Sequence, residues 1–469
     1  MSNALKLKAK KRVMEPAFFY LTSPAAARYS IPDFCNNNPQ RDNMSKPKNS
    51  PSARKLAVAL VMAAPLGAAM ATNGYFSHGY GMKSKGMGGA AATATDNSFA
   101  GANNPAASAW AGDRAELGVD LFMPKRGMSR TGSPFGFNAS VDSDKNHFFI
   151  PELGFNRAIS NQLGVGFTIY GNGGLNTDYA GGQINCGGGP NTSNTLCGSG
   201  RLGVDLIQLI VAPTVAYKFN EQHSIGISPL LVHQRFKAQG LQAFTAPGSS
   251  SAPASVTNNG TDTSNGVGVR FGYLGKLSSA FSVGASYAPK IGMSKFEKYA
   301  GLFADGGDFD IPANYTLGLS FQPVTAVTLA LDYQRIEYSG VRAVSNPSSP
   351  PVAQLGAPNG PGFGWSDINV VKLGVQWQVM PALALRAGFN SGGNPIQGRD
   401  VTFNILAPGV TTQHYTFGGT YTLSPGTELT MSYMQAPTQS VTAVSPGFGG
   451  TETIRMSQRA LGIQMGWRF

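Results

Sequence analysis

Alternation of apolar and polar residues, repeated in segments of about ten residues, restricts the fold of this chain most strongly. The last segment, LGIQMGWRF, places Leu461, Ile463, Met465, Trp467 and Phe469 on one side of a strand. Small or polar residues lie on the other side. Because chain ends usually fray, such an apolar terminal strand is more typical of a membrane barrel than of an edge strand in a soluble sheet.

Fourteen segments of this kind can be counted after the first hundred residues. We expect strands at 115–123, 146–158, 163–171, 203–219, 223–240, 266–277, 281–291, 310–322, 327–341, 368–379, 382–391, 412–423, 427–436 and 457–469. Asp332, Lys372, Arg386 and Arg468 all fall on the more polar face of their segments. That face suits a lumen that holds water or ligand, and the apolar face suits lipid.

The connections between these segments alternate in length. Short links such as 220–222 and 424–427 alternate with long Gly-, Pro-, Ser- and Asn-rich links such as 342–367 and 437–456. Up-and-down strands in a membrane give this pattern, with tight periplasmic turns and larger external loops. A soluble β-sandwich shares the alternation of residues but not this pattern of links. We therefore predict an all-β fold, a 14-stranded antiparallel transmembrane β-barrel in the outer membrane of a Gram-negative cell.

Composition agrees with this class. Charged residues make up 13% of the chain, against about 25% in soluble domains, and there are 60 glycines. Only one apolar run, ARKLAVALVMAAPLGAAMATNGYF, resembles a helix that enters a membrane. It has a basic start, a short apolar centre broken by Pro and Gly, and a small-x-small site, so a signal peptide is favoured over an anchor.

We expect this signal peptide at 44–71, with cleavage after Ala71, and regard residues 1–43 as an upstream extension or a start-site artefact. Residues 1–71 hold 11 of the 36 Lys and Arg residues and 3 of the 24 Asp and Glu residues. Without them the formal charge falls from +12 to +4, so the basic pI gives little support to nucleic-acid binding. We predict no nucleic-acid partner.

Two cysteines, Cys186 and Cys197, remain in the predicted mature chain. Their spacing in INCGGGPNTSNTLC predicts a small disulfide-closed loop in an oxidising compartment, with two free thiols in a flexible loop as the alternative.

Residues 72–114 are too rich in glycine and too weakly periodic to be strands. A barrel of fourteen strands has a lumen too wide for its own side chains to fill, so we expect this segment to fold inside as a plug, or hatch. The barrel would then span 115–469. A disordered periplasmic tail is the alternative, but such a tail would be more charged and poorer in aromatic residues.

One stretch of this segment, GMGGAAATATDNSFAGANNPAA, resembles the hatch of the outer-membrane long-chain fatty-acid and hydrocarbon transporters (FadL-like). The matching positions are Asp96, Asn97, Asn104, Pro105 and Ala106. The resemblance covers the whole predicted mature chain. It implies passive uptake of hydrophobic molecules, which external loops capture and hatch movement releases.

A second stretch, QLGVGFTIYGNGGLNTDYAGG at 162–182, is similar to the third strand of that family, where a kink opens the barrel wall sideways. Gly171, Gly173 and Gly174 match the kink, and glycines inside a strand do permit bends or bulges. The alternative is that these glycines only begin an external loop. A third match is DFDIPANYTLGLSFQ at 308–322.

Candidate ligand-binding residues are aromatic or apolar groups of the hatch and of the external side. They are Tyr75, Phe76, Tyr80, Phe236, Leu241 and Phe244. The basic residues that receive a carboxylate in the fatty-acid member do not match cleanly, since Arg235 and Lys237 are displaced and 362–370 has no lysine. A neutral hydrocarbon or aromatic substrate therefore stays open.

We expect the partners to be a hydrophobic small-molecule ligand, outer-membrane lipid, lipopolysaccharide and the barrel-assembly machinery. The resemblance implies that Trp467 and Phe469 form the assembly signal, and we expect a monomer. We expect no enzyme activity, no cofactor and no metal site, because the five histidines are scattered and no catalytic motif is present. A general diffusion porin and a lipid-acting barrel enzyme are the alternatives.

Overall fold

The structure is a computed structural model that describes residues 73–187, 189 and 191–469. The predicted signal peptide and upstream extension lie outside these residues. None of the described helices is both long and apolar enough to cross a membrane.

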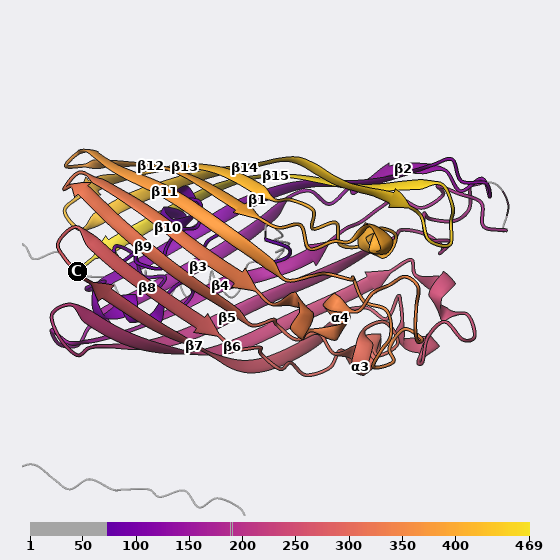
Figure 1. Cartoon of the computed structure of the whole chain (residues 1–469), viewed down its shortest axis with the longest axis horizontal. Helices are drawn as coiled ribbons and strands as arrows, with labels where there is room; N and C mark the ends of the chain where they lie inside the picture. Colours follow the sequence, from indigo (N-terminus) through magenta and orange to yellow (C-terminus); the bar gives the residue numbers. More distant parts are fainter. Residues whose placement is uncertain (1–72, 188, 190) are drawn as a thin grey trace, which may run out of the picture. The chain divides into compact units, whose positions relative to one another are not determined.

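Fourteen long strands form one closed antiparallel sheet (Figure 1). In chain order they are β1 (Arg114–Thr131), β3 (Phe148–Ala158), β4 (Leu163–Asn176), β5 (Gly203–Lys218), β6 (His223–Gln239), β7 (Asp262–Lys276), β8 (Phe281–Ala288), β9 (Asn314–Val324), β10 (Val327–Ile336), β11 (Ile368–Met380), β12 (Leu383–Gly392), β13 (Gln413–Ser424), β14 (Thr427–Val444) and β15 (Thr451–Arg468). Each strand pairs with the next, and β15 pairs with β1 to close the ring. The predicted 14-stranded barrel is confirmed.

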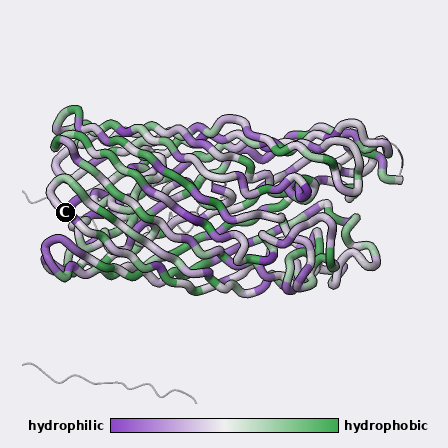
Figure 2. Tube along the Cα trace, viewed as in Figure 1, coloured by the Kyte–Doolittle hydropathy of each residue, from purple (hydrophilic) through white to green (hydrophobic). Residues whose placement is uncertain are grey.

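The two faces of the sheet differ in polarity, and hydropathy alternates along its strands (Figure 2). Large apolar side chains such as Leu317, Leu373 and Trp377 are exposed on the outside. Lys372 and Arg386 are buried on the inside, as alternation within their strands predicts. Closure pairs each of the fourteen strands with two neighbours, so backbone groups are satisfied within the wall, as hydrocarbon requires, except along one stretch between β3 and β4.

Residues 73–113, which we call the hatch, are irregular apart from α2 (Met82–Gly86) and η1 (Pro105–Ala109). The hatch lies within the barrel, at the end where the chain terminates (Figure 1). Its backbone rests against the wall where the strands carry glycine. A methyl group on any of these glycines would come within 3.2 Å of the hatch; they are Gly154, Gly164, Gly226, Gly272, Gly284, Gly318, Gly374, Gly388, Gly418 and Gly462.

One expectation about the external side is wrong. The segment 437–456 was expected to be a loop, but β14 continues to Val444 and β15 begins at Thr451. β1 also continues to Thr131, and a short strand β2 (Ala139–Asp142) pairs with its far part. Most outward positions of this hairpin carry Ser, Thr or Arg in place of large apolar residues, with Val444 as the exception, so the alternation that marks the other strands is missing.

The long connections carry short helices and pack together at the other end of the barrel. These helices are η2 (Gln242–Thr245), η3 (Pro253–Ser255), η4 (Glu297–Tyr299), α3 (Ala304–Gly307), η5 (Tyr338–Gly340), α4 (Arg342–Ser345), η6 (Gly398–Asp400) and η7 (Phe403–Ile405). The main apolar core contains side chains from these connections, the hatch and the inner wall. A disulfide joins Cys186 to Cys197 in the β4–β5 connection.

Candidate functional site

The Asn-Pro-Ala motif fixes the hatch to the wall. The Asn104 side chain accepts a hydrogen bond from the Ala106 amide and so caps η1. Its amide nitrogen also donates to the carbonyl oxygens of Ala92, at 2.7 Å, and of Tyr273 on β7, at 2.9 Å. Pro105 lies against Gly226, where an added methyl group would stand 2.4 Å from its carbonyl carbon. The motif therefore acts by close backbone contact, which any larger wall residue would prevent.

The acidic-Asn pair, Asp96 and Asn97, precedes the Asn-Pro-Ala motif in the hatch. The Asp96 carboxylate is 3.8 Å from the Arg386 guanidinium of β12, and the Asp96 carbonyl accepts a hydrogen bond from Lys83 at 2.7 Å. Asn97 folds back and accepts a hydrogen bond from the Phe99 amide at 2.9 Å. These two residues therefore shape the turn and connect it to the wall.

Buried ion pairs hold the lysines of α2. The Lys85 ammonium is 2.8 Å from Asp120 on β1 and 2.5 Å from Glu152 on β3, and the three side chains are at most 5% exposed. Lys83 is 2.5 Å from Glu428 on β14 and 3.7 Å from Glu116 on β1. Two cations of the hatch are thus held by four carboxylates from three strands.

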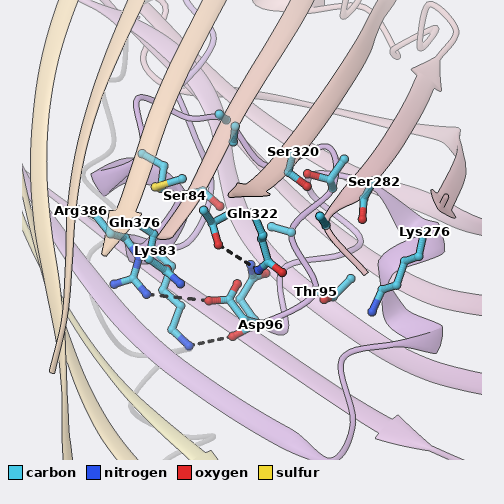
Figure 3. A pocket seen from close by; sticks show the side chains of 18 of the residues that line it. Lys83, Ser84, Thr95, Asp96, Lys276, Ser282, Ser320, Gln322, Gln376 and Arg386 are labelled. Carbon is cyan, nitrogen blue, oxygen red and sulfur yellow. Dashed lines mark hydrogen bonds and ion pairs between the residues drawn. The ribbon is translucent and has the colours of Figure 1, made fainter. Parts of the chain in front are cut away.

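A polar cavity of about 410 Å³ lies between the hatch and the short-turn end of the wall (Figure 3). Lys83, Asp96 and Arg386 converge on one side of it, whereas Lys276 reaches in from the other. The remaining lining is mostly hydroxyl and amide, including Ser282, Ser320, Gln322 and Gln376. Such a cavity favours water and polar solutes over apolar molecules.

The side of the hatch that faces the long connections is aromatic instead. Tyr75, Phe76, Phe309, Tyr338 and Trp365, which we call the aromatic cluster, lie with neighbouring ring centroids 5.2–6.2 Å apart. All five side chains are at most 3% exposed. Hydrogen bonds fix the orientation of the Tyr338 ring, because its hydroxyl donates to the Asn73 carbonyl oxygen at 2.5 Å and accepts from the Tyr75 amide.

The structure brings the six predicted ligand-binding residues into one apolar core. Phe236 reaches the aromatic cluster through Phe303, whose ring is 4.7 Å from Phe236 and 4.9 Å from Phe309. Phe244 reaches it through Phe403 and Phe363. Tyr80 packs on Tyr170 at 4.6 Å, and Leu241 is buried in the same core.

Sequence reasoning missed Tyr338, Trp365, Phe303 and Phe403, which complete this core. They lie in irregular connections, where no periodic pattern marks a residue as buried. Trp365, Phe303 and Phe403 had no signal except that they are large aromatic residues inside long Gly- and Pro-rich segments. Tyr338 falls within the strand expected at 327–341, which in the structure ends at Ile336.

The basic residues raised for carboxylate binding point away from this core. Gln234 and Phe236 of β6 are buried on the inner side, so Arg235 and Lys237, which alternate with them, face outward. Arg270 and Lys372 line a small polar hole together with Phe76 and Tyr80. Arg270 donates to the Gly101 and Ala102 carbonyl oxygens of the hatch.

The wall itself has an unpaired stretch between β3 and β4. Among the described residues, the pairing of these strands ends at Leu153 and Ile169. Beyond that point Phe148–Glu152 pair with β1, and residues 170–176 pair with β5, with a register shift between Gly171 and Gly173. We call this stretch the seam. It shows that the predicted glycines lie inside a bulged strand and do not begin a loop.

The hatch covers the seam from inside. The Ser77 amide donates to the Asn172 carbonyl, and the Gly174 amide donates to the Tyr75 carbonyl, both at 3.2 Å. Because β5 holds the other edge of β4, these bonds use the edge that β3 leaves free. Gly173 permits the approach, since a methyl group there would lie 1.9 Å from the Tyr75 carbonyl oxygen.

A family model described as outer membrane protein transport protein (OMPP1/FadL/TodX) matches residues 58–469. The chain belongs to this family. The predicted family and outer-membrane location are confirmed, and the family is one of transport proteins. No curated protein matches the chain.

Several solved structures share the fold of this family member. The toluene transporter TodX of Pseudomonas putida has a TM-score of 0.61 and 20% identity, over 84% of this chain and 99% of its own. The toluene transporter TbuX of Ralstonia pickettii has a TM-score of 0.58 and 18% identity, over 84% and 99%. A FadL homologue of Pseudomonas aeruginosa has a TM-score of 0.60 and 14% identity, over 84% and 100%.

The ion pairs of α2 give a first prediction. Lys85→Met leaves the buried carboxylates of Asp120 and Glu152 without their cation, which should cost about 3–5 kcal/mol. We expect faster hydrogen exchange at residues 81–87 of this family member and leakage of small sugars through the barrel. Lys145→Met is the control, because its pair with Asp205 is partly exposed to solvent and should contribute about 0–1 kcal/mol. Equal exchange in the two variants would contradict a hatch held by these pairs.

Asp308 gives a second prediction, on pH. Burial, the hydrogen bond to Asp310 and the negative charge of Asp310 raise the pKa of Asp308 from 3.8 to about 6. The folded state therefore binds this proton more tightly than the unfolded state does, and stability falls as pH rises from about 4 through 6. Phe309 lies between the two acids and packs on Tyr75, so the effect acts beside the aromatic cluster.

Asp308→Asn should remove this loss of folding stability at higher pH, because the asparagine side chain does not ionise. We expect the variant and the wild type to unfold at the same temperature near pH 4, and the variant to unfold at the higher temperature near pH 7.5. Thermal unfolding of the detergent-solubilised protein across this range measures the difference. A difference that does not change with pH would contradict the raised pKa.

Proposed function

We propose that this protein transports hydrophobic small molecules passively across the outer membrane. Ligand enters among the long external connections, passes into the apolar core around the aromatic cluster, and leaves sideways through the seam after the hatch has moved. Outer-membrane transport follows from the family, whereas the hydrophobic substrate and this path are our inference.

The contrast between the two sides of the hatch carries the proposal. On the external side, Tyr75, Phe76 and Trp365 belong to a continuous aromatic and aliphatic core. On the periplasmic side, Lys83, Asp96 and Arg386 line a polar cavity. An apolar molecule is stabilised above the hatch and loses that stabilisation below it, so a straight path into the periplasm is disfavoured.

The seam supplies an alternative path that leads into lipid. Within the described part of the chain, the hatch backbone bonds to the free edge of β4 through residues 75–77, and the Tyr80 hydroxyl donates a further hydrogen bond to the Asn172 carbonyl oxygen. Movement of the segment 75–77 breaks its two backbone hydrogen bonds to β4, the hydrogen bond from the Tyr75 amide to the Tyr338 hydroxyl, and the packing of Tyr75 and Phe76. The ion pairs of Lys83 and Lys85 can stay in place. The proposed opening is therefore local, and the rest of the hatch continues to block the lumen.

The substrate class follows less directly. Two of the solved structures that share the fold are toluene transporters, and this points to an arene. The aromatic cluster favours an arene or alkane by burial of apolar surface. Arg235 and Lys237 face outward and cannot receive a carboxylate in the lumen.

A comparison of uptake tests the proposed function. Cells that produce the protein should take up labelled toluene, an alkane or oleate faster than cells that lack it, and they should not become permeable to sucrose. A general diffusion porin predicts the opposite result, sucrose leakage with no selective hydrophobic uptake. Equal uptake of all three hydrophobic compounds in both strains would overturn the transporter proposal.

Substitution at Gly173 tests the path. Gly173→Ala places a methyl group against the Tyr75 carbonyl oxygen and should push 75–77 off the seam. We expect faster hydrogen exchange at these residues and faster hydrophobic uptake. Gly419→Ala on β13 is the control, because its methyl group would meet no atom closer than 3.5 Å. Faster exchange at 75–77 without a change in uptake would contradict exit through the seam.

A further inference from the structure

The outer surface of β1, β14 and β15 extends well beyond the lipid-facing rows. A membrane-spanning strand needs about 9–11 residues, whereas each of these strands has 18. Their surplus lies on the external side, where β14, β15 and β2 project past the ends of β9–β11 (Figure 1). This surface therefore stands among the headgroups and sugars of the outer leaflet.

Three cations gather at the base of the extension. Lys125 of β1 lies opposite Ser457 of β15, so it stands diagonally between Arg455 and Arg459. All three occupy outward positions, since buried residues alternate with them along both strands. Diagonal neighbours lie about 7–8 Å apart, so these long side chains can meet over one anionic group.

Their charge is only partly neutralised. Arg455 is 2.7 Å from Asp142 of β2, and this contact crosses Gly127, where a methyl group would collide with both side chains. Lys125 and Arg459 have no ion pair or hydrogen bond from their side chains within the described part of the chain. The patch of Lys125, Arg455 and Arg459, which we call the basic patch, keeps a formal charge of +2 beside Asp142.

The rows above and below the basic patch differ in chemistry. Toward the membrane, Leu121 pairs with the exposed Leu461, and Val119 pairs with Ile463. Away from it, the outward positions carry mostly hydroxyl groups, with the exposed Val444 at the tip as the exception: Ser129, Thr131, Thr438, Ser440, Thr442, Thr451 and Thr453. From the membrane outward the order is apolar, cationic and hydroxyl-bearing.

We propose that the basic patch binds the phosphates of the phosphorylated glycolipid of the outer leaflet, lipopolysaccharide. Arginine binds phosphate through paired hydrogen bonds, and lysine adds a point charge. The glycolipid acyl chains would then lie on the apolar rows and its sugars beside the hydroxyl groups. A neutral or zwitterionic lipid would match the acyl and sugar contacts but leave two positive charges without counter-ions.

A lipid-binding measurement on the full chain, extracted from the outer membrane in detergent, tests this site. It compares the wild type with a triple variant, Lys125→Gln, Arg455→Gln and Arg459→Gln. Arg157→Gln is the matched control, because Arg157 is an exposed outward cation near the C-terminal end of β3, far from the basic patch along the barrel wall. The probes are lipid A with both phosphates and lipid A from which the phosphates have been removed.

We expect the triple variant to bind phosphorylated lipid A at least roughly tenfold more weakly than the wild type, because it loses charge-assisted hydrogen bonds. The control should bind as the wild type does. The wild type should bind dephosphorylated lipid A as weakly as the triple variant binds the phosphorylated form. Lys125→Gln alone, which leaves the Arg455–Asp142 pair in place, should have an intermediate affinity and serves if the triple variant fails to fold.

Three results would overturn the assignment. One is equal affinity of the wild type and the variants for phosphorylated lipid A. Another is equal affinity of the wild type for the two forms of the lipid. The third is wild-type binding of soluble polyphosphate as tight as that of lipid A, which would show a general anion patch. Hydrophobic uptake should be unchanged in these variants, so the test is independent of the proposed transport path.

Discussion

Closure of the backbone in lipid is the constraint on which the rest of this structure depends. Fourteen strands can satisfy one another's hydrogen bonds only as a ring, and a ring of this size leaves a bore that its own side chains cannot fill. The hatch fills the bore, and the wall is adapted to it. Glycines such as Gly226 and Gly388 allow backbone to approach backbone, and buried carboxylates such as Glu152 receive the lysines of α2. This close contact between wall and hatch accounts for part of the high glycine content of the chain, 60 residues.

The attachments of the hatch differ along its length, and this difference decides which part can move. Around α2 and the Asn-Pro-Ala turn, ion pairs and amide hydrogen bonds join it to β1, β3, β7 and β14. Around Tyr75 and Phe76 the contacts are aromatic packing, two backbone bonds to β4 and one hydrogen bond from the Tyr75 amide to the Tyr338 hydroxyl. When the segment around Tyr75 and Phe76 moves, an apolar ligand can replace the aromatic packing that the segment loses. An apolar ligand cannot replace the ion-pair partner of a buried lysine or carboxylate, so movement of α2 would be far more costly.

The strands were predictable because lipid outside and polar groups inside impose alternation, as around Leu373 and Lys372. The β14–β15 extension was not predictable, because its outward face lies beyond the hydrocarbon and Ser or Thr replaces most of the apolar residues. The seam could be placed near Gly171–Gly174, but its closure by Ser77 depends on a contact between distant segments. Of the aromatic cluster, Tyr75 and Phe76 were predicted but Trp365 was not, because Trp365 lies in an irregular connection and is buried solely by tertiary packing.

The extension of β1, β14 and β15 has an inner and an outer face with different contacts. Met128, Ile454 and Met456 point inward and join the apolar core that contains the aromatic cluster. Arg130 and Glu452, buried among them, form an ion pair that ties β1 to β15 above the membrane. The outward face carries the basic patch and hydroxyl groups. Because alternation puts the two sets on one pair of strands, whatever holds the outer face in the headgroup layer also steadies the wall against which the ligand-facing core packs.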